Sequence, residues 1–231
     1  GRLSRSLPTL VELSLASPPT RTFGGLRVDL VYGDLAFATA DAIANAANDQ
    51  LVMGGGVAAA LRAEGGETIQ SEAVQSAPTP LGDVVRTGAG DLLARFVYHA
   101  VVIRYDLKGG TRKADVRVAV RNLLAFAAED NASTLALPLF GAGVGGLAVG
   151  ESLETILDAL EEHAESAPTL RVEVRVVDEA EFLAACESWQ RYQTRTRRDA
   201  QVGRAAEDYM QRLLEERARE PEDFSDLEWE G

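Results

Sequence analysis

The sequence has little cysteine, histidine or aromatic character. Among 231 residues, Cys186 is the sole cysteine, and His99 and His163 are the two histidines. An intrachain disulfide is therefore excluded, and nothing in the cysteine content points to secretion. Two distant histidines and one cysteine do not make a zinc site, and Cys186 has no evident histidine partner for nucleophilic chemistry. We expect no metal or other cofactor. His99 falls in a continuous apolar run, so we expect a hydrogen-bonded core histidine there.

Long apolar runs and basic charge are also lacking. No apolar segment approaches the roughly 18 residues that cross a bilayer. Glu12, Ser14 and Pro18 interrupt the apolar character of the amino-terminal segment, unlike a signal peptide. The net charge of −13 disfavours binding to the phosphate backbone of nucleic acid. We therefore expect a cytoplasmic protein that binds neither nucleic acid nor a membrane.

The chain does contain enough apolar residues for a core, and their spacing alternates between two periods. Hydrophobic residues make up 46% of the sequence. Period-two alternation or continuous β-branched runs predict strands at 26–34, 41–48, 82–90, 94–105, 133–140 and 171–177. Helical spacing predicts helices at 57–66, 115–131, 153–160 and 178–186. Strands that alternate with helices indicate a three-layer α/β/α sandwich with a mixed, largely parallel central sheet.

The composition changes after Ser188, where the chain becomes mostly charged. We predict three parts: an amino-terminal extension at 1–25 that could add an edge strand, a ligand-binding domain at 26–188, and a charged helical tail at 189–231. The tail carries an apolar stripe at Tyr209, Met210, Leu213 and Leu214. Its acidic end is typical of disordered segments.

Two glycine-rich loops follow predicted strands and precede predicted helices. The first holds the consecutive glycines 54–56, and the second, 141–146, has G-x-G-x-x-G spacing. Such loops bring backbone N–H groups close to a diphosphate, with the positive end of a helix behind them. A nicotinamide fingerprint would instead follow the first strand, with an acidic residue about 20 residues later. Here the second loop comes late, and the next strand ends only at Asp178. A glycine-rich turn without a ligand stays open as an alternative.

Three polar residues lie near the same predicted strand ends. Asn45 and Asn48 can each donate and accept, which suits ribose hydroxyls. Asp34 could accept a hydrogen bond from an adenine amino group. Each has a local alternative: Asn48 and Asp34 as turn formers, and Asn45 as an amide that bonds nearby backbone.

These motifs, taken in order, resemble the macrodomain family. The chain reads Gly33-Asp34-Leu35, then D-A-I-x-N-A-A-N at Asp41–Asn48, then Gly54–Val57, Tyr98–Val101 and Pro138–Gly146. The resemblance spans about Leu26 to Ser188. It implies a mixed sheet between helices and a cleft for ADP-ribose, either free or attached to protein as mono-ADP-ribosyl groups.

The resemblance also implies roles for individual residues. Asp34 would bind the adenine amino group, the Leu35 amide a ring nitrogen, and Asn48 the distal ribose. Gly56 and Val57 would line the diphosphate, and the second loop would wrap the diphosphate and distal ribose. The implied ligand-binding set is Asp34, Leu35, Asn45, Asn48, Gly54, Gly55, Gly56, Val57, Gly141, Ala142, Gly143, Val144, Gly145 and Gly146.

Departures from the family pattern bear on catalysis. Efficient ADP-ribosyl hydrolases often have Asp and His where this chain has Ala58 and Arg62, and many members have an aromatic at the position of Gly145. Val177 and Asp178 stand where an aromatic often stacks on adenine. We therefore expect ADP-ribose binding. The alternative is a hydrolase that removes ADP-ribose from acidic side chains or deacetylates O-acetyl-ADP-ribose, with Asn48 holding the water as its catalytic residue.

Overall fold

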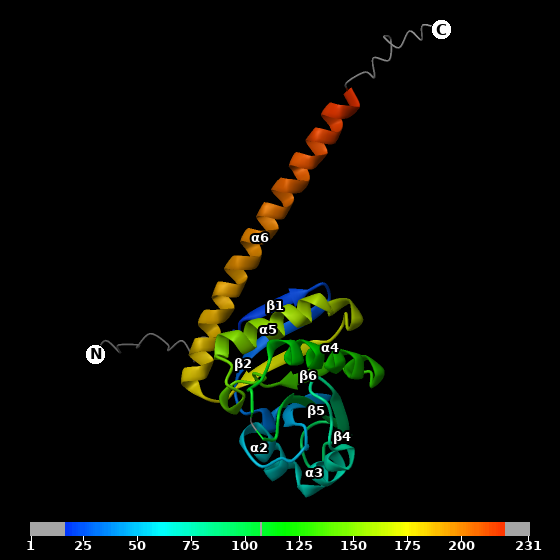
Figure 1. Cartoon of the computed structure of the whole chain (residues 1–231), viewed down its shortest axis with the longest axis vertical. Helices are drawn as coiled ribbons and strands as arrows, with labels where there is room; N and C mark the ends of the chain where they lie inside the picture. The colour runs from blue at the N-terminus through cyan, green and yellow to red at the C-terminus, as the bar shows by residue number, and fades with distance from the viewer. Residues whose placement is uncertain (1–16, 107, 220–231) are drawn as a thin grey trace, which may run out of the picture. The chain divides into compact units, whose positions relative to one another are not determined.

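The computed structural model describes residues 17–106 and 108–219, with side chains described up to residue 212. Within this part of the chain, seven strands form one sheet in the order β1-β2-β7-β6-β3-β5-β4 (Figure 1). Their bounds are β1 (Thr20–Phe23), β2 (Leu26–Tyr32), β3 (Ala42–Asn48), β4 (Val84–Gly88), β5 (Phe96–Ile103), β6 (Thr134–Leu137) and β7 (Arg171–Val176). The five inner strands are parallel, and β1 and β4 pair antiparallel at the two edges. The predicted mixed, largely parallel sheet is confirmed.

Helices cover both faces of this sheet. Four of them are α2 (Gly56–Gly65), α3 (Glu67–Ala73), α4 (Lys113–Glu129) and α5 (Val149–Glu162), and α4 and α5 lie side by side (Figure 1). Short 3-10 helices are η1 (Leu35–Phe37), η2 (Val74–Ser76), η3 (Gly143–Gly145) and η4 (Ala164–Ser166). The helices predicted at 57–66, 115–131 and 153–160 correspond to α2, α4 and α5. Helix α3 was not predicted, because a seven-residue helix gives too few turns for a clear apolar period.

The strand alternation divides the core between the two faces. On one face, Ile43 of β3 and Val97 of β5 pack in a buried cluster with Leu61 of α2 and Ile69 of α3. On the other face, the Tyr98 ring lies 5.8 Å from the Phe126 ring of α4. Successive side chains of a strand point to opposite faces, so neighbouring residues of β5 serve different layers. This arrangement is the predicted three-layer sandwich.

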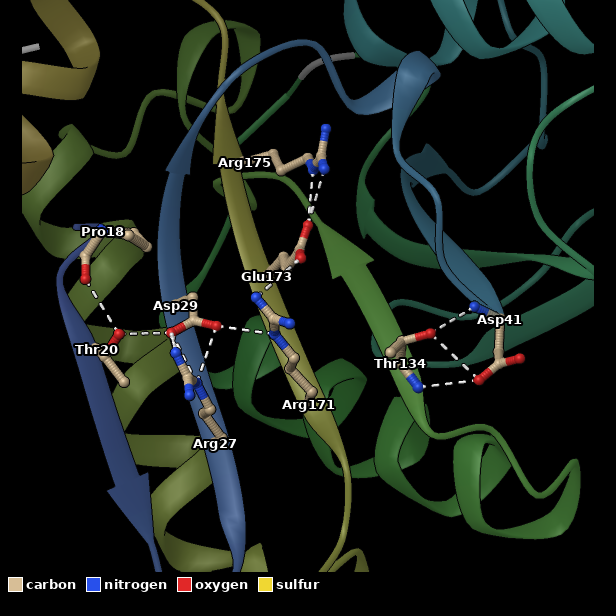
Figure 2. A network of polar contacts seen from close by, with 9 residues as sticks. All are labelled: Pro18, Thr20, Arg27, Asp29, Asp41, Thr134, Arg171, Glu173 and Arg175. Carbon is tan, nitrogen blue, oxygen red and sulfur yellow. Dashed lines mark hydrogen bonds and ion pairs between the residues drawn. The ribbon is translucent and has the colours of Figure 1, made fainter. Parts of the chain in front are cut away.

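A buried carboxylate ties the edge strand to the sheet. Asp29 of β2 is fully buried, accepts a hydrogen bond of 2.6 Å from Thr20 Oγ1 of β1, and forms ion pairs with Arg27 (3.0 Å) and Arg171 of β7 (2.9 Å) (Figure 2). Burying a carboxylate is costly unless it is paired and hydrogen-bonded. Asp29 therefore links β1, β2 and β7.

The last described helix, α6 (Glu179–Arg219), begins where a helix was predicted and continues into the tail. The chain divides into two units, residues 1–189 and 190–231. In the first unit, Phe182 and Trp189 of α6 are buried. In the second, Tyr209 and Met210 of the predicted apolar stripe are exposed. Leu213 and Leu214 lie beyond the described side chains, and the acidic end that was predicted to be disordered lies outside the described residues.

The described helices include none whose length and apolar composition would allow it to span a membrane.

His99 of β5 forms buried polar contacts with the two neighbouring strands, β3 and the edge strand β4. Its Nδ1 lies 3.2 Å from Asn45 Nδ2, and its Nε2 lies 3.1 Å from Thr87 Oγ1, which donates to the Gly88 carbonyl at 2.9 Å. The expectation of a hydrogen-bonded core histidine is confirmed. Burial lowers the pKa of His99 to about 4, so the folded protein keeps this imidazole neutral in weak acid.

This neutral histidine should make the fold sensitive to mild acid. The unfolded chain protonates a histidine near pH 6.5, whereas folded His99 resists protonation until about pH 4. The unfolded state therefore binds more protons in this window, and the free energy of unfolding should fall by about 2 kcal/mol from pH 7 to pH 5. Urea unfolding at both pH values measures this, with His99→Gln as the control that lacks the titrating group. Equal pH slopes for the two proteins would contradict the assignment.

Candidate functional site

A cleft of about 560 Å³ lies at the carboxyl ends of the five parallel strands. Its lining residues come from the segments that follow β2, β3, β5, β6 and β7. Ligands of open α/β sheets bind beyond the carboxyl ends of strands, because the loops there converge on one edge. The predicted site residues that line the cleft are Asp34, Leu35, Asn48, Gly54, Gly55, Gly56, Val57, Ala142, Gly143 and Val144.

Asn45 does not line the cleft, contrary to prediction. It is buried in β3 and directs its side chain to His99. The strand period of two explains the difference, since Ala46 and Asn48 share one side of β3 and line the cleft while Asn45 points to the other side. The local alternative for Asn45, an amide in a nearby hydrogen bond, is closer to what the structure shows, although its partner is an imidazole.

Gly141, Gly145 and Gly146 do not line the cleft either. A Cβ on Gly141 would lie 2.6 Å from Thr111 Cγ2, and one on Gly145 would lie 3.1 Å from Thr111 Cβ and closer still to its hydroxyl. Thr111 is buried and donates to the Val102 carbonyl at 2.9 Å, so its side chain is fixed. Close packing against Thr111 thus explains Gly141 and Gly145. Gly146 has φ +79° and no atom within 4 Å of an added Cβ, so its backbone conformation is what favours glycine there.

The first glycine loop opens directly into helix α2. Gly55 is the N-cap residue with extended backbone, and Gly56 has φ +54°. A Cβ on either would meet no atom of the chain within 4 Å, so neither position is crowded by the protein itself. The first N–H groups of an α-helix have no intrahelical partner. The amino terminus of α2 therefore presents free N–H groups and a partial positive charge at the cleft.

The second glycine loop contributes Ala142, Gly143 and Val144 to the cleft, around the short helix η3. Gly143 has φ +73°, a conformation that L-residues rarely adopt, and a Cβ there would also meet open space. Val144 lines the cleft and is 72% exposed. Both loops thus offer backbone and little side-chain bulk to the same cavity.

Asp34 caps helix η1 and also lines the cleft. Its Oδ1 accepts a 2.9 Å hydrogen bond from the Ala36 N–H, which is the turn-forming alternative considered for this residue. Among the described residues, Oδ2 receives no hydrogen bond. One carboxylate oxygen fixes the turn, and the other is available to a donor in the cleft.

Asn48 likewise combines a structural contact with a place in the cleft. Its Oδ1 accepts from the Gln50 N–H at 3.1 Å and the Val52 N–H at 3.3 Å, and its Nδ2 donates to the Val52 carbonyl at 2.8 Å. The amide clamps the loop between β3 and the glycines. One N–H of Nδ2 is left to contact a ligand.

Sequence reasoning missed several lining residues at or just after the ends of β5 and β7. These are Ile103, Arg104, Tyr105, Arg175, Val176 and Glu181. Tyr105 is 59% exposed, and its N–H donates to Asp49 Oδ1 at 2.6 Å. A usable signal was present, because the end of every parallel strand borders the same edge. The predicted binding residues instead lay only near Asp34, Asn45, Asn48 and the two glycine loops.

The comparisons with known proteins agree with this architecture. A family model described as "Macro domain" matches residues 44–156. An uncharacterised protein of Aeropyrum pernix is 41% identical over 132 residues, covering 56% of this chain and 68% of that protein. One of Pyrobaculum aerophilum is 38% identical over 152 residues, covering 64% of this chain and 82% of that protein.

Solved structures share the fold at lower identity. The Oceanobacillus iheyensis macrodomain aligns with a TM-score of 0.69 and 21% identity over 76% of this chain and 97% of that one. The Trypanosoma brucei macrodomain in complex with ADP-ribose aligns with a TM-score of 0.61 and 24% identity over 68% of this chain and 67% of that one. These solved structures thus share the mixed α/β sandwich fold of this chain. The chain belongs to the macro domain family.

Alanine substitutions at two glycines should distinguish a glycine that packing requires from one that packing does not require. Gly145→Ala should lower the free energy of unfolding by about 1–3 kcal/mol, because the methyl group would overlap fixed Thr111. Gly55→Ala should change it by less than about 1 kcal/mol, because Gly55 is extended and faces open space. Urea unfolding of both variants measures the difference. Equal destabilisation would contradict the roles assigned to the two glycines.

Proposed function

We propose that this protein binds ADP-ribose, either free or as mono-ADP-ribosyl groups on protein, in the cleft between the two glycine loops. The observation that carries the proposal is that the first turn of α2 and the Ala142–Val144 segment line one cavity. Both offer backbone N–H groups with no Cβ in the way at Gly55, Gly56 and Gly143. A diphosphate is the ligand group that such paired loops accommodate best.

The remaining lining residues suggest how the ligand lies. Asp34 and Leu35 would bind adenine, since Asp34 Oδ2 can accept from the exocyclic amino group and the Leu35 N–H can donate to a ring nitrogen. The diphosphate would lie between Gly55–Val57 and Ala142–Val144. The distal ribose would lie near Asn48, whose second Nδ2 hydrogen could donate to a hydroxyl.

We propose binding without turnover. Ala58, which lines the cleft on the first turn of α2, supplies neither a base nor a nucleophile. The amide of Asn48 is already engaged by Gln50 and Val52, which leaves little freedom to position an attacking water. No lining residue favours the hydrolase alternative over a reader of ADP-ribose.

Calorimetric titration of the full chain tests the proposal. ADP-ribose should bind with a dissociation constant on the order of micromolar, roughly −8 kcal/mol. AMP should bind at least about tenfold more weakly, because it lacks the second phosphate and the distal ribose. Incubation with ester-linked mono-ADP-ribosylated protein should release ADP-ribose only at the background rate. Absence of ADP-ribose binding, or equal affinity for AMP, would contradict the two-loop site.

A carboxylate in the first loop should abolish binding without harming the fold. Gly55→Glu places bulk and negative charge where the diphosphate would lie, and loss of two charge-assisted amide contacts lowers affinity by about 10²- to 10⁴-fold. The backbone at Gly55 is extended, and a carboxylate near a helix amino terminus is favourable, so stability should be retained.

Gly203→Glu is the matched control for the added charge. Gly203 lies in α6, and a Cβ there would meet no atom within 4 Å. The Gly203→Glu variant should bind ADP-ribose with the affinity of the unmodified chain. A folded Gly55→Glu variant with normal affinity would exclude the first loop from the site.

A further inference from the structure

Charged residues of alternating sign follow one face of β7 toward the cleft. Arg171, Glu173 and Arg175 are spaced by two residues and therefore lie on the same side of the strand (Figure 2). Arg171 pairs with buried Asp29 at 2.9 Å and with Glu173 at 3.6 Å, and Glu173 pairs with Arg175 at 2.9 Å. The row thus connects the fixed centre of the β2–β7 pair to a residue that lines the cleft.

Arg175 is the end of this row, and it contacts the turn that follows β2. Its Nη1 donates to the Asp34 carbonyl at 3.2 Å, and its side chain is only 17% exposed. A second bond reinforces the same junction, because the Gly33 N–H donates to the Val176 carbonyl at 2.9 Å. The Gly33–Leu35 turn is therefore attached to β7 by one backbone bond and one arginine bond.

Each of the three guanidinium nitrogens of Arg175 donates a hydrogen bond to a defined partner. Nε and Nη2 donate to Glu173 Oε2 at 3.0 and 2.9 Å, which leaves Nη1 for the Asp34 carbonyl. A planar guanidinium held at two edges keeps one orientation, whereas a lysine ammonium is a flexible point donor. The arginine can thus transmit the fixed position of Glu173 to the turn.

We propose that Arg175 is a positioning residue that sets base selectivity in the cleft. It anchors the backbone of Asp34, while the Ala36 N–H fixes Asp34 Oδ1. The carboxylate then holds Oδ2 where it accepts from an exocyclic amino group, so a base with that group is preferred to one with a carbonyl in its place. This inference rests on the proposed function, since the ligand is a nucleoside diphosphate sugar.

Selectivity between two ligands tests this role more directly than affinity does. ADP-ribose and the corresponding hypoxanthine compound differ at two adjacent positions of the base. The exocyclic donor amino group is replaced by an acceptor carbonyl, and the neighbouring ring nitrogen changes from an acceptor to an N–H donor. The two ligands share their phosphates and sugars. A substitution that only removes charge from the protein or lowers its stability therefore weakens the binding of both ligands equally, and the affinity ratio stays the same. A residue that served only the stability of the fold would leave this ratio unchanged.

The experiment is calorimetric titration of both ligands into three full-length proteins. The unmodified chain should prefer ADP-ribose by about tenfold or more, which is the effect of one hydrogen bond to a charged group. Arg175→Met should reduce the preference to less than about threefold. Arg27→Met is the matched control, because Arg27 pairs with the same Asp29 network but does not line the cleft. It should keep the full preference.

Arg175→Lys provides a second variant with a donor retained. It should recover part of the preference, between the values of the Met variant and the unmodified chain, and it stands in if the Met variant does not fold. An unchanged ratio in the Arg175 variants, or an equal fall in Arg27→Met, would overturn the proposal. Failure of the unmodified chain to bind either ligand would instead overturn the proposed function.

Discussion

The parallel pairing of five strands is the constraint on which the rest of the molecule depends. β3 lies between β6 and β5 in the sheet, with Ile43 opposite both Ala136 and Val97. Because β2, β7, β6, β3 and β5 all run the same way, their carboxyl ends meet at one edge. Every loop that lines the cleft leaves the sheet at that edge. The site exists because the strand directions bring together segments as distant in sequence as Asp34 and Arg175.

The glycines of the two loops divide into two physical classes. Gly141 and Gly145 are required by packing against Thr111, which the sheet fixes through the Val102 carbonyl. No packing contact requires a glycine at position 55, because the Gly55 backbone is extended and an added Cβ would meet no atom of the chain within 4 Å. Glycine is among the residues that a helix N-cap favours, so the cap alone accounts for Gly55. Under the proposed function, the same open space lets a ligand approach the backbone of α2.

The sequence allowed most of the fold to be predicted, because the periodic segments were long. The apolar run that became β5 and the amphipathic spacing of α4 and α5 are strong local signals. Side-chain contacts between neighbouring strands could not be predicted from the sequence. Asn45 resembled a ligand-binding amide until its pairing with His99 was visible, and that pairing depends on which side of β3 it faces. Arg175 was missed because its role comes from the Asp34 turn, far away in sequence.

Amide chemical shifts of the full chain, followed by NMR during titration with ADP-ribose, test the central claim most directly. The account predicts the largest shifts at the first turn of α2, from Gly56 to Ala58, and at Gly143 and Val144, where backbone N–H groups would meet the diphosphate. A second hollow lies beside the β1–β2 turn and is lined by Arg21, Gly25 and Pro168. Shifts confined to that hollow, with both glycine loops unaffected, would contradict the account.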